Sequence, residues 1–181
     1  LPDMHIKMRT NRGVTHEIVR MRLCSFAQES TRYVKYRQVP YIIPEWASAI
    51  SLLESPQNIK NRLFLSSCMS ASEVYSERLQ AGHSAQEARG SLNNDTASYI
   101  NVKTNMREWL HIFGLRCDSP AHPDMRMLAC GIADYLRSNN DLMKEIFSYF
   151  LDIEKNIQWF RKEKYVETIE KVHYVVPYID G

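Results

Sequence analysis

Residues 14–37 read VTHEIVRMRLCSFAQESTRYVKYR, and this stretch decides the fold. Its first part predicts an amphipathic helix, because apolar residues recur at a spacing that would place them on one face. The residues of that face, which we expect to pack on a core, are Val19, Leu23, Phe26 and Ala27. Arg20 and Arg22 would point in different directions from the same helix.

Just past the predicted helix, residues 28–33 place short polar side chains beside an arginine, in the order QESTRY. Arginine presents a rigid fork of donors that matches phosphate, and a serine hydroxyl with backbone N–H groups can complete an anion site. The same residues could also form a basic, solvated helix end. The chemistry of the residues alone leaves both interpretations open.

Residues 20–33, RMRLCSFAQESTRY, resemble the signature of the flavin-dependent thymidylate synthases, an Arg-His-Arg opening followed by seven residues and a serine. Arg20, Arg22 and Ser30 keep that spacing, whereas Met21 stands where the family usually has histidine. The lead-in over residues 11–17 is also similar to the family.

A second segment that resembles this family is NMREWLHIFGLR, residues 105–116. The family has Asn-x-Arg at the start of this segment and Leu-Arg at its end, and the matching residues are Asn105, Arg107, Leu115 and Arg116. Arg89, just before Gly90, matches a family arginine that ends a helix and reaches the nucleotide phosphate.

The resemblance implies an α+β fold, in which an antiparallel sheet packs with long helices and four identical subunits form a homotetramer with sites between them. It spans about residues 4–138, so residues 1–138 would form the family domain and residues 139–181 a helical extension of it. Leu1 is not a native start. We therefore expect the N-terminal part of the family fold to be missing.

The resemblance also implies a reaction, the methylation of dUMP to dTMP with methylenetetrahydrofolate as carbon donor and NADPH-reduced FAD as hydride source. Arg116 would be catalytic, stabilising negative charge that develops on the pyrimidine ring. The residues expected to bind dUMP are Glu17, Arg20, Gln28, Glu29, Ser30, Thr31, Arg32, Arg89 and Arg116. The residues expected to bind FAD are Arg20, Met21, Arg22, Leu23, Gln28, Asn105, Arg107 and Leu115.

Two alternative functions remain open on the sequence, a pyrimidine nucleotide hydroxymethylase on the same scaffold and a non-catalytic nucleotide-binding paralogue. Ser30 lacks a base at a recognisable spacing that would activate it as a nucleophile. Cys24 and Cys117 lie beside matched residues, but we interpret them as small buried filler.

Composition excludes several classes of function for this chain of 181 residues, which is long enough for one domain with a core. Its net charge of +2 favours neither nucleic acid nor a membrane surface, and no apolar run approaches the roughly 18 residues of a membrane helix. Its four cysteines form no C-x-x-C pair, which predicts reduced thiols in a cytoplasmic protein. The loop at residues 117–124 contains Cys, Asp and His, but its prolines and capping residues favour a structural role over metal binding.

The remaining sequence predicts strands at residues 4–10 and 96–104 and several helices. The helices are expected at residues 45–54, 57–80, 85–89 and 105–116, then up to about 137 and over 142–164, with a strand-like end at 172–179. Ser84 with Glu87 and Asn105 with Glu108 form capping-box patterns. On the helix at 57–80 we expect a buried stripe of Ile59, Leu63, Met69, Val74 and Leu79, and on that at 105–116 a buried stripe of Met106, Leu110 and Phe113. Trp109 would lie off that second stripe. The aromatic residues Tyr36, Tyr41 and Trp46 would either stack on a planar ligand or pack within their loop.

Overall fold

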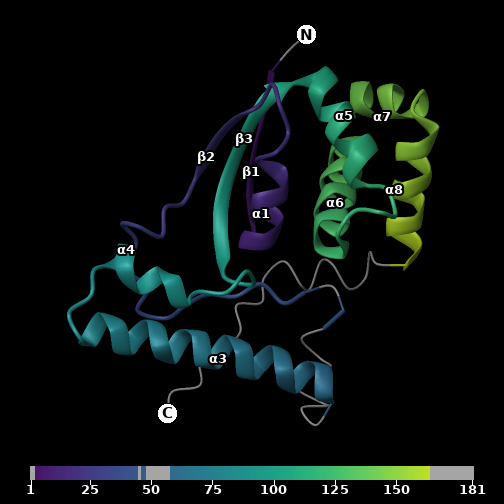
Figure 1. The fold of residues 1–181 in the computed structure, drawn as a ribbon. Coiled ribbons are helices and arrows are strands. Elements are labelled where there is room, and N and C mark those ends of the chain that lie inside the picture. The colour runs from purple at the N-terminus through teal and green to yellow at the C-terminus, as the bar shows by residue number, and fades with distance from the viewer. Residues whose placement is uncertain (1–2, 45, 48–57, 164–181) are drawn as a thin grey trace.

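The computed structural model describes residues 3–44, 46–47 and 58–163. In this part of the chain three antiparallel strands form one sheet, and most helices gather on one of its sides (Figure 1). The strands are β1 (Asp3–Asn11), β2 (Ser25–Gln28) and β3 (Ala97–Asn105), in the spatial order β1-β3-β2. The α+β class predicted from the sequence is confirmed.

The helices follow the predicted ranges closely except in the signature segment. They are α1 (Arg12–Ile18), α3 (Ile59–Gln80), α4 (Ala85–Ala88), the 3-10 helix η1 (Arg89–Ser91), α5 (Met106–Arg116), α6 (Pro123–Asn139), α7 (Asp141–Ser148) and α8 (Leu151–Glu163). Most of the helix predicted at residues 45–54, and all of the strand-like end predicted at 172–179, lie outside the described residues.

The two predicted strands pair with each other along their whole length, from Asp3 opposite Asn105 to Asn11 opposite Ala97. Side chains alternate across the sheet, so Met8 and Ile100 are buried on the face that the helices cover, while Tyr99 on the other face is 44% exposed. The sheet therefore has one packed and one open face.

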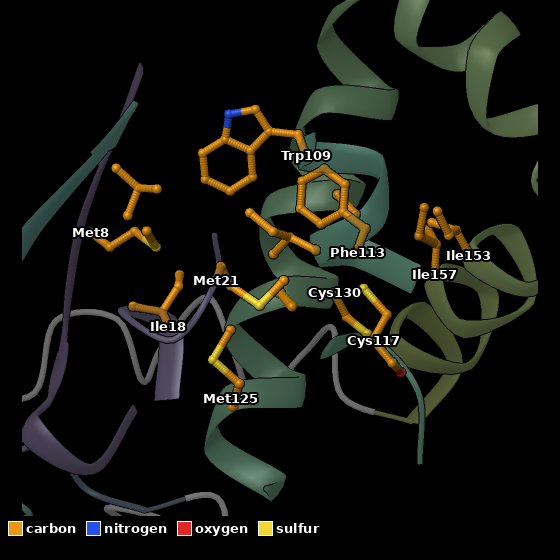
Figure 2. Close-up of a cluster of buried hydrophobic side chains, with 14 of the residues drawn as sticks. Met8, Ile18, Met21, Trp109, Phe113, Cys117, Met125, Cys130, Ile153 and Ile157 are labelled. Carbon is orange, nitrogen blue, oxygen red and sulfur yellow. The ribbon is translucent and has the colours of Figure 1, made fainter. Parts of the chain in front are cut away.

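A hydrophobic cluster joins the covered face of the sheet to α1, α5, α6, α7 and α8 (Figure 2). Trp109 is 1% exposed and its indole Nε1 donates to the Met4 carbonyl at 3.1 Å, which fastens α5 to β1. The Trp109 ring stacks on Phe113, whose ring in turn meets Phe147 of α7 edge-on. Burying side chains of this size stabilises the fold by roughly 1.5–3 kcal/mol each.

The signature segment is not one long helix, which corrects the sequence prediction. Helix α1 ends at Ile18, and residues 25–28 pair with β3 as strand β2 instead. Val19 and Leu23 of the predicted stripe are 38% and 82% exposed. Leu23 has a φ of 62°, and the Thr104 hydroxyl donates to its carbonyl at 2.8 Å. Pairing with β3, a strand distant in sequence, overrides the local helical pattern.

Helix α3 exists where it was predicted, but a different face of it is buried. Ile59, Leu63 and Met69, expected inside, are 54%, 61% and 65% exposed. The buried residues are Asn61, Phe64, Cys68, Ala71 and Tyr75. Because apolar side chains occur nearly all round this helix, its periodicity could not select the buried side.

The buried side of α5 also differs from the predicted stripe. Trp109, which was expected off the stripe, is buried, whereas Met106 and Leu110 are only partly buried. The caps were predicted better. Asn105 Oδ1 accepts the Glu108 N–H at 3.0 Å, and Ser84 and Glu87 form a complete capping box around the start of α4.

Candidate functional site

Arg116, at the C-terminal end of α5, lies against the end of α1. Its Nη1 is 3.4 Å from Glu17 Oε2, its Nη2 is 3.5 Å from the Glu17 carbonyl oxygen, and its Nη2 is 3.9 Å from Met21 Sδ. Its Nε is buried and has no hydrogen-bond partner in the part of the chain that the structure describes. An unmet buried donor costs about 1–3 kcal/mol, and more on a charged group, so this atom is suited to a ligand.

Gln28, at the end of β2, is tied to the helix side of the sheet. Its amide Nε2 donates to Thr15 Oγ1 at 2.9 Å and to Ser98 Oγ at 3.3 Å. Neither hydroxyl was among the predicted site residues. Strand alternation could have identified Ser98 as an inward residue of β3, because it has the same parity as Ile100.

The loop after β2 folds around Ser30. The Ser30 carbonyl accepts the N–H groups of Tyr33 and Val34, and its hydroxyl oxygen accepts the Arg32 N–H at 3.3 Å. Arg32 Nε donates to Gln86 Oε1 of α4 at 2.8 Å. Because Arg89 is the C-cap of α4, Ser30, Arg32 and Arg89 belong to one region of the molecule. Gln86, which orients Arg32, carried no signal in the sequence.

Glu29 and Tyr36 form a hydrogen-bonded pair in the same loop. The Tyr36 hydroxyl donates to Glu29 Oε1 at 2.6 Å, and burial followed by this hydrogen bond raises the pKa of Tyr36. Tyr36 also packs against Tyr75 of α3 with ring centroids 6.1 Å apart. Thr31 beside them is buried.

The aromatic residues of the loop pack within the protein. The Tyr41 hydroxyl donates to the Cys68 carbonyl at 2.8 Å, and burial raises the pKa of Tyr41 to about 12. Trp46 meets Phe64 of α3 edge-on at 5.9 Å. These contacts favour loop packing over stacking on a planar ligand.

Most of the residues predicted to bind a flavin are exposed. Arg20, Arg22, Leu23, Arg107 and Leu115 are exposed. Two members differ. Met21 is 8% exposed and points into the hydrophobic cluster, and Asn105 uses its Oδ1 as the cap of α5.

Within one copy of the chain these residues form separate groups. Glu17, Met21 and Arg116 meet on the helix side of the sheet, whereas Ser30 and Arg32 lie with α4 at the far end of β2. Figure 1 shows α4 to the left of the sheet and α5, which ends at Arg116, to its right. The structure does not bring the predicted arginines into one pocket.

The two cysteines that could act as nucleophiles are poorly suited to that role. Cys117 is fully buried, and its hydrogen bond with the Cys130 side chain, together with burial, raises its pKa. Burial also raises the pKa of Cys24. All four cysteines are free. Among the described residues, no three His, Cys, Asp or Glu side chains are grouped to hold a metal ion, and no helix is long and apolar enough to cross a membrane.

Comparison with known proteins identifies the family. The family model described as thymidylate synthase complementing protein matches residues 1–139. The chain belongs to this family. Its similarity to flavin-dependent thymidylate synthases, inferred from the two arginine motifs, is thereby confirmed.

Relatives in the family carry the name flavin-dependent thymidylate synthase. The one from Geobacter sulfurreducens is 33% identical over 121 residues, which cover 66% of this chain and 49% of that protein. The one from Corynebacterium aurimucosum is 31% identical over 152 residues, covering 76% and 58%. The chain therefore spans about half the length of the curated relatives that it matches.

A solved structure shares the fold. The UMP/dUMP methylase PolB from Streptomyces cacaoi, bound with 5-Br dUMP, superimposes with a TM-score of 0.66 at 21% sequence identity. The match covers 81% of this chain and 72% of PolB.

Proposed function

We propose that the chain belongs to an enzyme that methylates dUMP to dTMP, with methylenetetrahydrofolate as carbon donor and NADPH-reduced FAD as hydride source. The family and the dUMP methylase of the same fold support a nucleotide-modifying enzyme. The observation that carries the proposal is Arg116, whose buried Nε is an unmet donor on a guanidinium held in place by Glu17.

Arg116 would act electrostatically. A preorganised donor aimed at developing charge lowers a barrier without having to reorient during the reaction. The Glu17 carboxylate contacts Nη1 of this guanidinium and the Glu17 carbonyl oxygen contacts Nη2. Nε is left without a partner among the described residues and would donate to the pyrimidine ring. Glu17 would then contribute to dUMP binding through Arg116.

The phosphate of dUMP would bind at Ser30, Arg32 and Arg89. This proposal is supported by the hydrogen bond that Arg32 makes to Gln86, because it fixes one guanidinium beside the end of α4 where Arg89 lies. Both arginine side chains are exposed. A dianionic phosphate matches this pair of cations better than a neutral ligand would.

The residues present also fit FAD. Arg20, Arg22 and Arg107 are exposed cations that form no ion pair within the described part of the chain, and a diphosphate supplies the charge that they lack. Arg22, Asn105 and Arg107 would hold the cofactor, with Leu23 and Leu115 as apolar contacts. Bound reduced FAD would supply the hydride. Met21 would contribute by packing beneath Arg116.

We further propose a homotetramer with each site built between subunits. The support is the separation described above, since the region of Arg32 and the region of Arg116 lie apart in one copy. Residues of different copies would complete one site. The free thiols support a cytoplasmic location, where cysteines stay reduced.

The experiment is to incubate the full-length protein with FAD, NADPH, methylenetetrahydrofolate and dUMP and to measure the mass of the nucleotide product. The proposal expects a product heavier by one methyl group. A hydroxymethyl product would replace the proposed reaction with that of the alternative hydroxymethylase. Unchanged dUMP in a sample that still binds it would identify a non-catalytic nucleotide-binding protein.

A further inference from the structure

One face of α3 points away from the rest of the molecule. We call it the outer stripe, and its residues are Arg62, Leu65, Ser66, Met69, Ser70 and Glu73. Their spacing of three and four residues places them along one side of the helix. Leu65, at the edge of this side, is half-buried and packs against the cluster that contains Phe64, whereas the other five are exposed. Together they line a shallow groove of about 340 Å³.

The outer stripe combines apolar side chains with two opposite charges at its ends. Met69 is 65% exposed, and Ser66 and Ser70 beside it are small and exposed. Within the residues that the structure describes, neither Arg62 nor Glu73 forms an ion pair. In Figure 1, α3 lies apart from the sheet and from α5 to α8.

The order of these residues is complementary to itself in the antiparallel direction. A two-fold axis near the middle of the stripe would place Arg62 of one copy opposite Glu73 of the other, twice by symmetry. The same axis places Leu65 opposite Ser70 and Met69 opposite Ser66, so each large side chain meets a small one. Parallel pairing would instead oppose like charges.

We propose that α3 pairs antiparallel with α3 of a second copy of this chain through the outer stripe. The occupant is a second copy because both the charges and the side-chain sizes complement each other only after the two-fold rotation. The proposal rests on the assembly of copies in the proposed function and does not depend on the reaction at the nucleotide. Since α4 and η1 follow the C-terminal end of α3, the antiparallel pairing would place the Arg32 and Arg89 regions of the two copies at opposite ends of the paired helices.

Charge reversal in the full-length protein tests the pairing. Arg62→Glu alone and Glu73→Arg alone each place two like-charge contacts across the axis, so we expect the dissociation constant of the assembly to rise about tenfold or more. The double variant R62E/E73R restores both attractive contacts and should assemble like the wild type. Lys144→Glu, on the exposed side of α7, is the control and should not change assembly.

Mixing the two single variants gives the sharpest measurement. One copy then carries two acidic and the other two basic residues at the ends of the stripe, so the mixture should form the assembly that neither variant forms alone. Sedimentation velocity would measure the mass, and circular dichroism would show that each variant is folded.

The proposal is overturned by a wild type that sediments as a monomer, by single variants that assemble normally, or by a mixture that stays dissociated. If the wild type is a monomer, the outer stripe binds something other than a second copy of this chain. If the mass responds as expected while dUMP is not converted, the pairing stands and the proposed function fails. If dUMP is converted while the mass does not respond, only the pairing fails.

Discussion

The molecule has two regions that differ in how they are held together. The core body consists of the sheet with α1 and α5 to α8, and the α3 arm consists of α3, α4, η1 and the loop residues 29–44 and 46–47. The core body has a continuous cluster of large buried side chains from every one of its helices (Figure 2). Among the described residues the buried apolar cluster of the α3 arm consists of Tyr41, Ala47, Phe64 and Cys68. Outside this cluster, the arm is held by the buried Tyr75, by local hydrogen bonds and by a helix cap.

This difference separates the two tasks that the proposed function requires. Arg116 belongs to the core body, where packing on α6, α8 and β3 fixes the position of its helix. Arg32 and Arg89 belong to the α3 arm, which has fewer buried contacts and can open at a lower free-energy cost. The position of the Arg116 guanidinium thus depends on the core body. Phosphate binding by Arg32 and Arg89 depends on the α3 arm, which a second copy would stabilise.

The largest effect should come from Trp109→Ala in the core body. This substitution removes a ring that is 1% exposed and its hydrogen bond to Met4, so we expect a loss of about 3–5 kcal/mol in the free energy of unfolding. Chemical denaturation followed by circular dichroism measures it. Phe64→Ala in the α3 arm is the matched variant and should lower the global free energy by less, because it loosens the arm alone. Equal losses would show that the two regions unfold as one unit.

Arg116→Lys should reduce turnover by about 10²–10³-fold while stability changes little. Lysine keeps the positive charge but lacks the planar donors, Nε included, that Arg116 presents beside Glu17. Single-turnover kinetics with dUMP measures the chemical step, and thermal unfolding measures the fold. Glu17→Gln is the companion variant and should impair kcat more than KM. Normal turnover by Arg116→Lys would remove Arg116 from the proposed chemistry.

Arg32→Ala and Arg89→Ala should each weaken dUMP binding by about tenfold, with no loss in the unfolding free energy of the core body. Each removes one cation from an exposed anion region of the α3 arm. Titration calorimetry measures the affinity, and Lys144→Ala on α7 controls for the loss of a positive charge elsewhere. Gln86→Ala should weaken binding less, because it only releases Arg32. Unchanged affinity in both arginine variants would place the phosphate elsewhere.

The sequence predicted what local chemistry determines in both regions. The strands β1 and β3 show clear alternation, and the caps at Asn105 and Ser84 follow from residues three positions apart. The end of α1 at Ile18 could not be predicted, because residues 25–28 become a strand only by pairing with β3. Arg20, Arg32, Arg89 and Arg116 were recognised as a set from the resemblance to the flavin-dependent thymidylate synthases. Their separation within one copy depends on the tertiary fold and carries no sequence signal.

The smallest effect should come from the capping box that begins α4. Hydrogen bonds from the Ser84 side chain and backbone lower the pKa of Glu87 below its ordinary 4.5, so this contribution is present above that pH and is lost as the pH falls through the folded-state pKa. Glu87→Gln should therefore speed amide exchange at Ala88 relative to the wild type at pH 7, and the ratio of the two rates should approach one in acid. Exchange at Phe113 of the core body should not respond at any pH.

Because α4 carries Gln86 and ends at Arg89, the same variant should weaken dUMP binding slightly at pH 7, which would link the cap directly to the anion region. A response of Phe113 equal to that of Ala88 would mean that the α3 arm does not open separately from the core body.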